Sequence, residues 1–453
     1  MATEARLLIR GARLLCPFTG QDGPGDVLIA GERIQSIGEN LEDGSARVLE
    51  AKGRLLSPSF LDLHVHLREP GREDEETVAS GAEAALRGGF TAICCMPNTN
   101  PVIDCVPVAE AVLRQASAAR KADVRVVGAI TKGRQGRELA EMGLMWRQLG
   151  ISAFSDDGSS VADAMLMRRA MEYVRIFDGL IISHCEEPNL AKGGQMHEGY
   201  HSTRLGLRGI PAAAEEVMVA RDLILAELTG VRLHIAHLST SRSLEMVRIA
   251  KQRGLRVTAE ATPHHLVFSD EDLFEYETNL KVNPPLRSAA DREALREGLA
   301  DGTIDAIATD HAPHSQEEKE VEFDRASFGA IGMESAWPAL FTHLVATGNV
   351  ELKDVIAALT RGPARVLGME TDSLGLREGA PADLVLLDCE ADYSMEATAF
   401  ASLSRNCPFD GQRMKARVAC TIRRGEVMYE NREPQDAAKP AARGKKGVRS
   451  AAV

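Results

Sequence analysis

The sequence predicts an α/β protein: a (β/α)8 barrel of the TIM type, with a small β-sandwich domain formed by both chain ends. The middle of the chain alternates short apolar runs of β type with segments whose apolar residues recur at helical spacing. The two ends contain only short strand-like runs separated by turns. An open doubly wound sheet is the alternative for the middle. Eight strand-helix units, and no Gly-x-Gly-x-x-Gly after the first strand, favour the barrel.

The two ends are expected to share one domain because both are rich in strand signals. The N-terminal runs are residues 6–15, 26–30 and 33–37. The C-terminal runs are residues 383–388, 417–423 and 426–429. We therefore assign residues 1–57 and 366–431 to the β-sandwich domain.

The barrel is expected over residues 58–365, which is larger than usual and implies long loops. Its eight predicted strands are residues 60–66, 90–96, 124–130, 151–155, 180–184, 232–237, 256–261 and 305–309. Helical spacing is clearest in residues 75–87, 161–174, 212–228 and 241–253.

Charge separates the end of the chain from the rest. Residues 432–453 hold six basic and two acidic side chains, so this stretch carries +4 of a total of −13. The remaining 431 residues therefore carry −17. With its alanines and prolines, the segment is expected to be a disordered basic tail.

Composition excludes several classes of protein. The 453 residues are 44% hydrophobic and 26% charged, which is typical of a globular chain. No apolar run reaches the roughly 18–20 residues that cross a bilayer, and charges interrupt the N-terminal apolar residues. Eight cysteines are too few for a disulfide scaffold. We expect a cytoplasmic protein with no membrane or nucleic-acid partner, since phosphate contacts need a basic surface.

The first predicted barrel strand ends in His64-Val65-His66. Side chains alternate along a strand, so the two imidazoles point the same way and suit a metal as neutral ligands. Barrel enzymes assemble their sites at the carboxyl ends of the strands, and His64 and His66 lie there.

Other predicted strands also have histidine or aspartate side chains at their carboxyl ends. Asp156 and Asp157 follow the fourth strand, His184 and His237 end the fifth and sixth, and Asp310 follows the eighth. Four imidazoles with one or two carboxylates exceed the three protein ligands of a mononuclear catalytic zinc. They suit two metal ions roughly 3.5–4 Å apart, linked by a bridging carboxylate.

The remaining histidines near these strands fail this test. His234 has the opposite strand parity to His237, so it is expected to face the surrounding helices. His264 and His265 follow Pro263 after the seventh strand and are expected to shape that loop.

Several motifs together resemble the class I dihydroorotases of bacteria, within the amidohydrolase superfamily. The similarity runs from about residue 9 to residue 429 and excludes the tail. The motifs are His64-Val-His66-Leu-Arg68-Glu-Pro-Gly71, Met96-Pro-Asn98-Thr99, Ser155–Gly158, Asn283-Pro-Pro285 and Asp310-His-Ala-Pro-His314.

The resemblance implies two zinc ions (Zn2+) per subunit, bridged by an aspartate and a hydroxide. His64, His66 and Asp310 would hold one ion, and His184 and His237 the other.

The local pattern favours Asp157 over Asp156 as the bridge, and the neighbouring Asp156 stays an alternative. Many relatives, including hydantoinases, bridge with a carboxylated lysine. The fourth-strand segment has none, because the nearest lysines are Lys132 and Lys192. The aspartate-bridged branch is therefore favoured.

The implied activity is the reversible conversion of (S)-dihydroorotate and water to N-carbamoyl-L-aspartate in pyrimidine (UMP) biosynthesis. The bridging hydroxide would attack the ring amide carbonyl and Asp310 would shuttle the proton. The implied substrate contacts are His66, Arg68, Asn98, Asn283, His314, Phe328 and Gly329.

Physical chemistry supports two further expectations. Arg68 offers a planar, two-pronged donor that matches a substrate carboxylate. The polar stretch of residues 315–327 follows the last strand and resembles a mobile lid, with a merely solvated loop as the alternative.

Two other functions remain open. One is an allantoinase or hydantoinase acting on another cyclic ureide. The other is a noncatalytic dihydroorotase-like partner of aspartate carbamoyltransferase, although the full ligand set counts against it. A small-molecule substrate, a homodimer and a complex with aspartate carbamoyltransferase are the expected partners.

Overall fold

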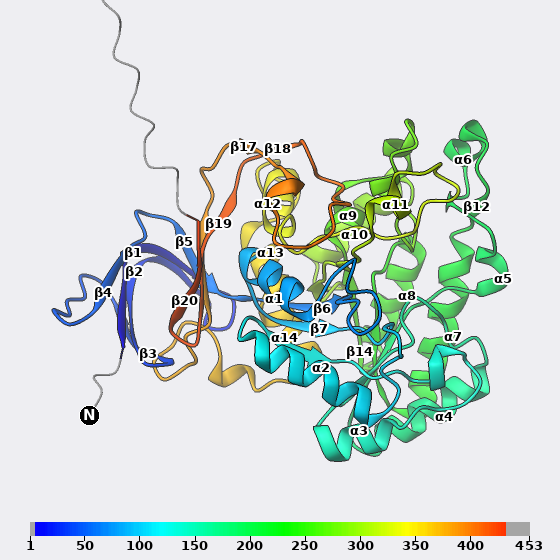
Figure 1. Cartoon of the computed structure of the whole chain (residues 1–453), viewed down its shortest axis with the longest axis horizontal. Coiled ribbons are helices and arrows are strands. Elements are labelled where there is room, and N and C mark those ends of the chain that lie inside the picture. The colour runs from blue at the N-terminus through cyan, green and yellow to red at the C-terminus, as the bar shows by residue number, and fades with distance from the viewer. Residues whose placement is uncertain (1–4, 432–453) are drawn as a thin grey trace, which may run out of the picture.

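The computed structural model describes residues 5–431, so the predicted basic tail lies outside the described residues. In Figure 1 the strands from both ends of the chain lie together on one side, and the middle of the chain forms the larger body beside them. Within residues 5–431, no helix is long and apolar enough to span a membrane.

Eight parallel strands form the barrel, in chain order. They are β6 (Phe60–Val65), β7 (Phe90–Cys95), β8 (Asp123–Val126), β9 (Ala153–Phe154), β10 (Leu180–Ser183), β13 (Arg232–Ile235), β14 (Val257–Ala261) and β15 (Ala306–Ile307). One hydrogen-bonded sheet contains β6, β7 and β8 in that order, and a second contains β9, β10, β13, β14 and β15. Single bridges between Gly128 and Phe154 and between Val65 and His311 join the two sheets. The ring is closed, and the predicted barrel is confirmed.

The barrel strands are buried on both faces, which explains their continuous apolar runs. Leu61, Leu63 and Ile182 belong to a core inside the ring, whereas Phe60, Ile93 and Ile235 belong to the core under the helices. Strands β9 and β15 are shorter than predicted because the chain leaves the ladder early and turns toward the mouth.

Helices cover the ring, and polar caps set where several of them begin. The longer ones are α1 (Val78–Arg87), α2 (Val106–Ala119), α3 (Met142–Leu149), α4 (Ala164–Arg175), α7 (Ala213–Thr229), α8 (Ser241–Gln252), α10 (Ala289–Ala300) and α13 (Leu352–Leu359). Thr77, Asp163 and Thr240 accept a hydrogen bond from a backbone N–H in the first turn of α1, α4 and α8. Shorter helices are α5 (Pro188–Ala191), α6 (Tyr200–Leu205), α9 (Pro263–Val267), α11 (Gln316–Lys319), α12 (Ala336–Leu340) and α14 (Arg361–Val366).

The two chain ends form one mixed sheet around its own apolar core. It contains β1 (Arg6–Cys16), β2 (Gln21–Ala30), β3 (Arg33–Gly38), β4 (Arg47–Glu50), β5 (Leu55–Pro58), β16 (Leu384–Asp388), β19 (Arg417–Arg423) and β20 (Glu426–Glu430). The ends meet where β5 pairs antiparallel with β16, with Leu56 opposite Leu386. The division at residues 57–58 and 365–366 stays a prediction; its first boundary falls within β5, one residue before that strand ends.

A segment of the C-terminal part also reaches the barrel mouth. Ser402 donates its hydroxyl hydrogen bond to Glu76 at 2.5 Å, and Asn406 donates to the carbonyls of Ala312 and Gly329 at 3.0 and 3.2 Å. Two-stranded pairs β17 (Tyr393–Ser394) with β18 (Arg413–Met414) and β11 (Met196–His197) with β12 (Gly209–Ile210) complete the loops.

Candidate metal centre

Five strand ends bring six buried side chains together at the carboxyl end of the barrel. The side chains are His64 in β6, His66 after it, Asp157 after β9, His184 after β10, His237 after β13 and Asp310 after β15. The turns that leave the strands are strained, since His237 and Asp310 have positive φ angles of 29° and 47°. Positive φ at non-glycine residues gathers at functional sites.

The Asp157 carboxylate lies at the centre of the four imidazoles. Its Oδ1 is 3.2 Å from His64 Nε2 and 3.3 Å from both His184 Nδ1 and His237 Nε2. Its Oδ2 is 3.4 Å from His66 Nε2. One carboxylate therefore lies beside every predicted histidine ligand.

Asp310, which follows β15, approaches the same cluster. Its Oδ1 is 3.0 Å from His66 Nε2 and 3.6 Å from His64 Nε2. His64, His66 and Asp310 form one group with metal-ligand spacing, and His64, Asp157 and His237 form another.

Asp156 is held away from the cluster by the preceding loop. Its Oδ1 accepts hydrogen bonds from the backbone N–H groups of Ile130 and Thr131 at 2.8 and 2.9 Å. Its Oδ2 accepts from the Thr131 hydroxyl. The structure thus brings Asp157, not Asp156, to the histidines.

The cluster favours ionised carboxylates although it is buried. Burial raises the pKa of Asp157, but His64 and the other imidazoles hold that pKa well below its ordinary value. Burial also raises the pKa of Asp310, and His64 and His66 more than reverse this, so that the pKa lies below its ordinary value. Two buried negative charges among imidazoles form an environment that attracts cations.

The donor atoms fit metal ions better than they fit hydrogen bonds. His64 Nε2 and His237 Nδ1 are buried and make no hydrogen bond within the described residues. His184 Nδ1 and His237 Nε2 face each other at 3.0 Å. Imidazole nitrogens and carboxylate oxygens are the donors that zinc prefers.

A second layer of polar side chains supports His64, and the sequence reasoning missed it. Glu260 in β14 lies with Oε1 2.9 Å from His64 Nδ1 and Oε2 3.0 Å from His234 Nε2. Burial raises the pKa of Glu260, but His234 and His64 lower it to about 2. Such a partner fixes the orientation of a ligand imidazole. The signal available in the sequence was a lone glutamate inside the apolar run 257–261.

The prediction that His234 faces the helices is wrong. His234 is fully buried and reaches Glu260 inside the ring. Strand parity does not extend to His237, because β13 ends at Ile235 and His237 has a positive φ. His234 and His237 can therefore both point inward.

Some of the predicted substrate contacts form a group around Arg68. Arg68 Nε donates to the carbonyl of Pro313 at 3.0 Å and lies 3.2 Å from Glu75, and its Nη2 is 3.4 Å from His314 Nε2. His314 Nε2 in turn lies 2.8 Å from the carbonyl of Phe328.

Asn98 and Asn283 form no group with Arg68. Asn98 Oδ1 is 2.8 Å from His66 Nδ1, which links it to the metal-ligand cluster. Asn283 Oδ1 is buried and makes no hydrogen bond within residues 5–431. Gly329 N donates to the carbonyl of Lys281 at 2.8 Å, and a Cβ at Gly329 would lie 2.9 Å from His314 Nε2. This close approach, with a φ of 134°, explains the glycine.

The histidines after β14 lie beside the cluster. His265 lies 2.7 Å from the Thr262 hydroxyl and 2.9 Å from the carbonyl of Pro284, so it ties α9 to the next loop. His264 is buried, and its Nε2 has no hydrogen-bond partner among the described residues.

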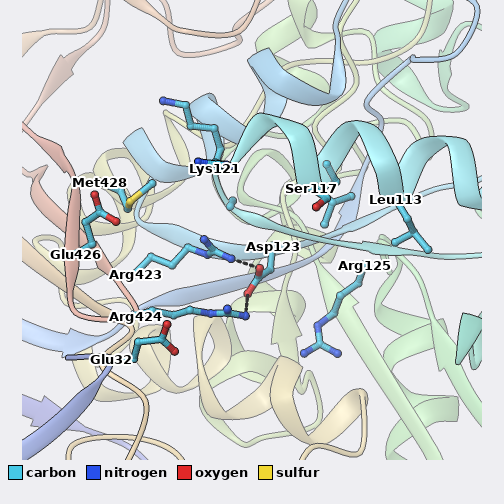
Figure 2. Close-up of a pocket in the computed structure, with 14 residues that line it drawn as sticks. Glu32, Leu113, Ser117, Lys121, Asp123, Arg125, Arg423, Arg424, Glu426 and Met428 are labelled. Atoms are coloured by element: carbon cyan, nitrogen blue, oxygen red, sulfur yellow. Dashed lines mark hydrogen bonds and ion pairs between the residues drawn. The ribbon is translucent and has the colours of Figure 1, made fainter. Parts of the chain in front are cut away.

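A cavity of about 730 Å3 lies elsewhere, at the start of β8 beside the hairpin of β19 and β20 (Figure 2). Its walls mix charges: Asp123 forms an ion pair with Arg423 and lies 3.7 Å from Arg424 Nη2. Because Asp123 begins β8, this cavity lies at the opposite end of the ring from the cluster. It contains none of the predicted site residues.

Comparisons with known proteins agree over almost the whole described chain. Residues 53–243 match the family model described as "Dihydro-orotase-like", and residues 210–429 match the model described as "Amidohydrolase family". The chain is 49% identical to a dihydroorotase of Pelotomaculum thermopropionicum, over 94% of this chain and 99% of the relative. It is 50% identical to a dihydroorotase of Anaeromyxobacter dehalogenans, over 94% and 98%.

Solved structures share the architecture. The L-hydantoinase (dihydropyrimidinase) from Arthrobacter aurescens has a TM-score of 0.84 at 25% identity, over 94% of this chain and 96% of that chain. The dihydropyrimidinase from Brevibacillus agri has a TM-score of 0.80 at 21% identity, over 94% and 95%, and supports the fold alone.

Proposed function

Because the chain belongs to the dihydroorotase family of the amidohydrolases, it is a cyclic amide hydrolase of pyrimidine biosynthesis, and we propose how its residues divide the work. The reaction converts dihydroorotate and water reversibly to N-carbamoyl-aspartate. The observation that carries the assignment of the site is the buried cluster of four histidines and two aspartates at the carboxyl end of the barrel.

The chemistry requires one bond to form and one to break. A water oxygen adds to a ring amide carbonyl carbon, the ring carbon–nitrogen bond breaks, and the leaving nitrogen takes a proton. The carbonyl carbon becomes the new carboxylate of the open chain. The site must therefore activate water, polarise the carbonyl and deliver a proton.

We assign His64, His66 and Asp310 to one zinc ion and His184 and His237 to a second, with Asp157 between them. When bound, two zinc ions supply polarisation of the carbonyl and activation of water at neutral pH. The unpartnered Nε2 of His64, which faces Asp157 and Asp310, supports this assignment. Glu260 would hold the His64 ring in the orientation that directs Nε2 at the ion.

Asp310 is the proposed proton carrier. Its carboxylate is ionised because the neighbouring imidazoles hold its pKa below the ordinary value. Its position at the strand end, 3.0 Å from His66 Nε2, places it where a proton could be taken from water and given to the ring nitrogen.

The ring carboxylate is assigned to the mouth. Arg68 supplies a guanidinium, and Asn98, Asn283 and His314 supply hydrogen bonds that orient the ring. The Phe328–Gly329 backbone lies 2.8 Å from His314 through the Phe328 carbonyl, which supports a shared role.

Substituting Asp310→Asn tests the proton-carrier role. General acid–base groups contribute roughly 10²–10⁴ in rate, so we expect kcat for dihydroorotate to fall at least a hundredfold with the fold unchanged. Turnover would be followed by absorbance, zinc by elemental analysis and folding by circular dichroism. Asp372→Asn, at an exposed carboxylate, is the matched control and should behave like the wild type.

The same assay separates the competing functions. If the protein contains zinc and hydrolyses hydantoin or allantoin but not dihydroorotate, the proposed substrate is refuted. Absence of both zinc and turnover would favour a noncatalytic protein. A wild-type rate in zinc-loaded Asp310→Asn would refute only the role of Asp310. A homodimer and a complex with aspartate carbamoyltransferase stay predictions.

A further inference from the structure

Arg134 is a cation without a carboxylate partner beside the metal-ligand cluster. It ends the short turn Lys132–Arg134 that follows β8. Its Nε donates to the carbonyl of Asp156 at 3.3 Å, and its Nη2 donates to the Ser159 hydroxyl at 3.2 Å. Among residues 5–431 it forms no ion pair.

The Arg134 guanidinium lies over the loop that carries Asp157. A Cβ built on Gly158 would lie 3.0 Å from Arg134 Nη2 and 3.7 Å from Asn98 Nδ2. The guanidinium and the Asn98 amide therefore flank the same glycine, directly after Asp157. Asn98 uses its Oδ1 on His66, which leaves its Nδ2 on the side of Gly158.

The loop is built to present this side chain. Gly133 and Arg134 are consecutive residues in the left-handed region, with φ angles of 56° and 55°. Arginine rarely adopts this conformation, so the surrounding contacts must hold it. Gly133 N donates to Asp104 Oδ2 at 2.8 Å, and Gly136 N donates to the Thr131 hydroxyl at 3.0 Å.

Nearby carboxylates offset the charge of Arg134 only from a distance, and none among residues 5–431 forms an ion pair with it. Burial lowers the pKa of Arg134, and Asp157 and Asp156 act against burial. Asp156 already accepts three hydrogen bonds from Ile130 and Thr131, and Asp157 is surrounded by imidazoles. The planar guanidinium therefore keeps the capacity to bind a further anionic group.

We propose that Arg134 is a second guanidinium for the substrate and contacts the ring carboxylate together with Asn98, opposite Arg68. This inference rests on the proposed function. The described chain is strongly acidic, so an anionic substrate depends on local cations, and planar guanidinium groups match a carboxylate well. The open-chain product keeps the same carboxylate, so both directions of the reaction would use Arg134.

The test compares steady-state kinetics of zinc-loaded wild type, Arg134→Gln and Arg134→Lys with dihydroorotate. A hydrogen bond to a charged group contributes enough binding that Arg134→Gln should raise KM about tenfold, with kcat within threefold of wild type. Arg134→Lys keeps the positive charge but loses the planar, two-pronged donor, so its KM should lie between those of the wild type and Arg134→Gln. Added salt should raise KM of the wild type more than KM of Arg134→Gln.

Arg137→Gln is the control, because Arg137 is an exposed arginine in the same loop. It should match the wild type. An unchanged KM in Arg134→Gln, or a loss of thermal stability and kcat at constant KM, would mean that Arg134 only braces the Asp156–Ser159 loop, and would overturn the inference. If the wild type itself does not hydrolyse dihydroorotate, the proposed function fails, and with it the substrate named for Arg134.

Discussion

At the scale of single residues, two neighbouring carboxylates acquire different roles from their partners. Asp156 accepts from two backbone N–H groups and a hydroxyl, which ties the end of β8 to the end of β9. Asp157 meets four imidazoles. Because the two residues are adjacent at the strand end, the Asp156 side chain points to the preceding loop and the Asp157 side chain points into the ring.

This difference predicts separate effects of the two isosteric substitutions. Asp157→Asn should lose at least one zinc per chain and nearly all turnover, because a neutral amide is a poor metal ligand. Asp156→Asn should keep its zinc but unfold at a lower temperature, since it weakens hydrogen bonds to a charged acceptor. Elemental analysis measures the zinc content of the two variants, and thermal unfolding measures their stability. Zinc lost from Asp156→Asn and kept by Asp157→Asn would reverse the assignment.

At the scale of elements, two lysine side chains hold the polar stretch of residues 315–327 in place through hydrogen bonds to backbone carbonyls. Lys319, at the end of α11, is buried and donates to the carbonyls of Ser327 and Gly329 at 2.8 and 2.9 Å. Lys281 donates to the carbonyl of Phe323 at 2.6 Å and lies 4.6 Å from the centre of the Phe328 ring. Whether the segment moves as a lid stays a prediction. The two lysines hold the Phe328–Gly329 backbone, which is proposed to contact the substrate.

Substituting Lys319→Met should loosen this segment, because it leaves the Ser327 carbonyl without its donor at a cost of about 1–3 kcal/mol, while the Gly329 carbonyl keeps only its hydrogen bond from Asn406. We expect faster proteolysis within residues 315–329 and a higher KM for dihydroorotate. Lys353→Met, at an exposed lysine, is the control. Equal proteolysis and KM in both variants would contradict the anchoring role.

The same lysine predicts a pH effect with a definite sign. Burial lowers the pKa of Lys319 to about 7, against an ordinary value of 10.5. Between these pH values the unfolded chain binds the extra proton, so this residue makes stability rise with pH from about 7 to 10.5. The stability of wild type relative to Lys319→Met should rise over that window in thermal unfolding. A constant difference would refute the shift.

At the scale of the whole molecule, the candidate ligands tie together distant parts of the ring. They come from β6 and from the turns after β9, β10, β13 and β15, which span residues 64 to 310. Metal bound across these strands would cross-link the barrel at its carboxyl end. The two ends of the chain are joined separately, in the terminal sheet, through the β5 and β16 pairing.

Metal removal should therefore lower global stability as well as activity. A ligand at a hundred times its Kd stabilises by about 2.7 kcal/mol, so chelation should lower the unfolding midpoint by several degrees. Added zinc should restore midpoint and turnover together. The Asp157→Asn protein should respond less to the chelator. An unchanged midpoint in metal-free wild type would mean that the strands are positioned without the ions.

The sequence by itself determined the barrel and predicted most of the candidate site. Strand and helix periods are local, so eight apolar runs and the segments between them already define the ring order. Candidate ligands such as His64, His184 and Asp310 lie at or just after the ends of these runs, so their shared location follows from strand direction alone. The family resemblance added the roles.

Only the tertiary structure decided which side chains meet beyond the strand ends. Once the chain leaves the ladder, alternation no longer predicts direction, as His234 and His237 demonstrate. The contact of Glu260 with His64 and the placement of Arg134 over Gly158 join segments far apart in the chain. Such contacts depend on backbone angles and ring closure rather than on any local pattern, and for that reason they required the folded molecule.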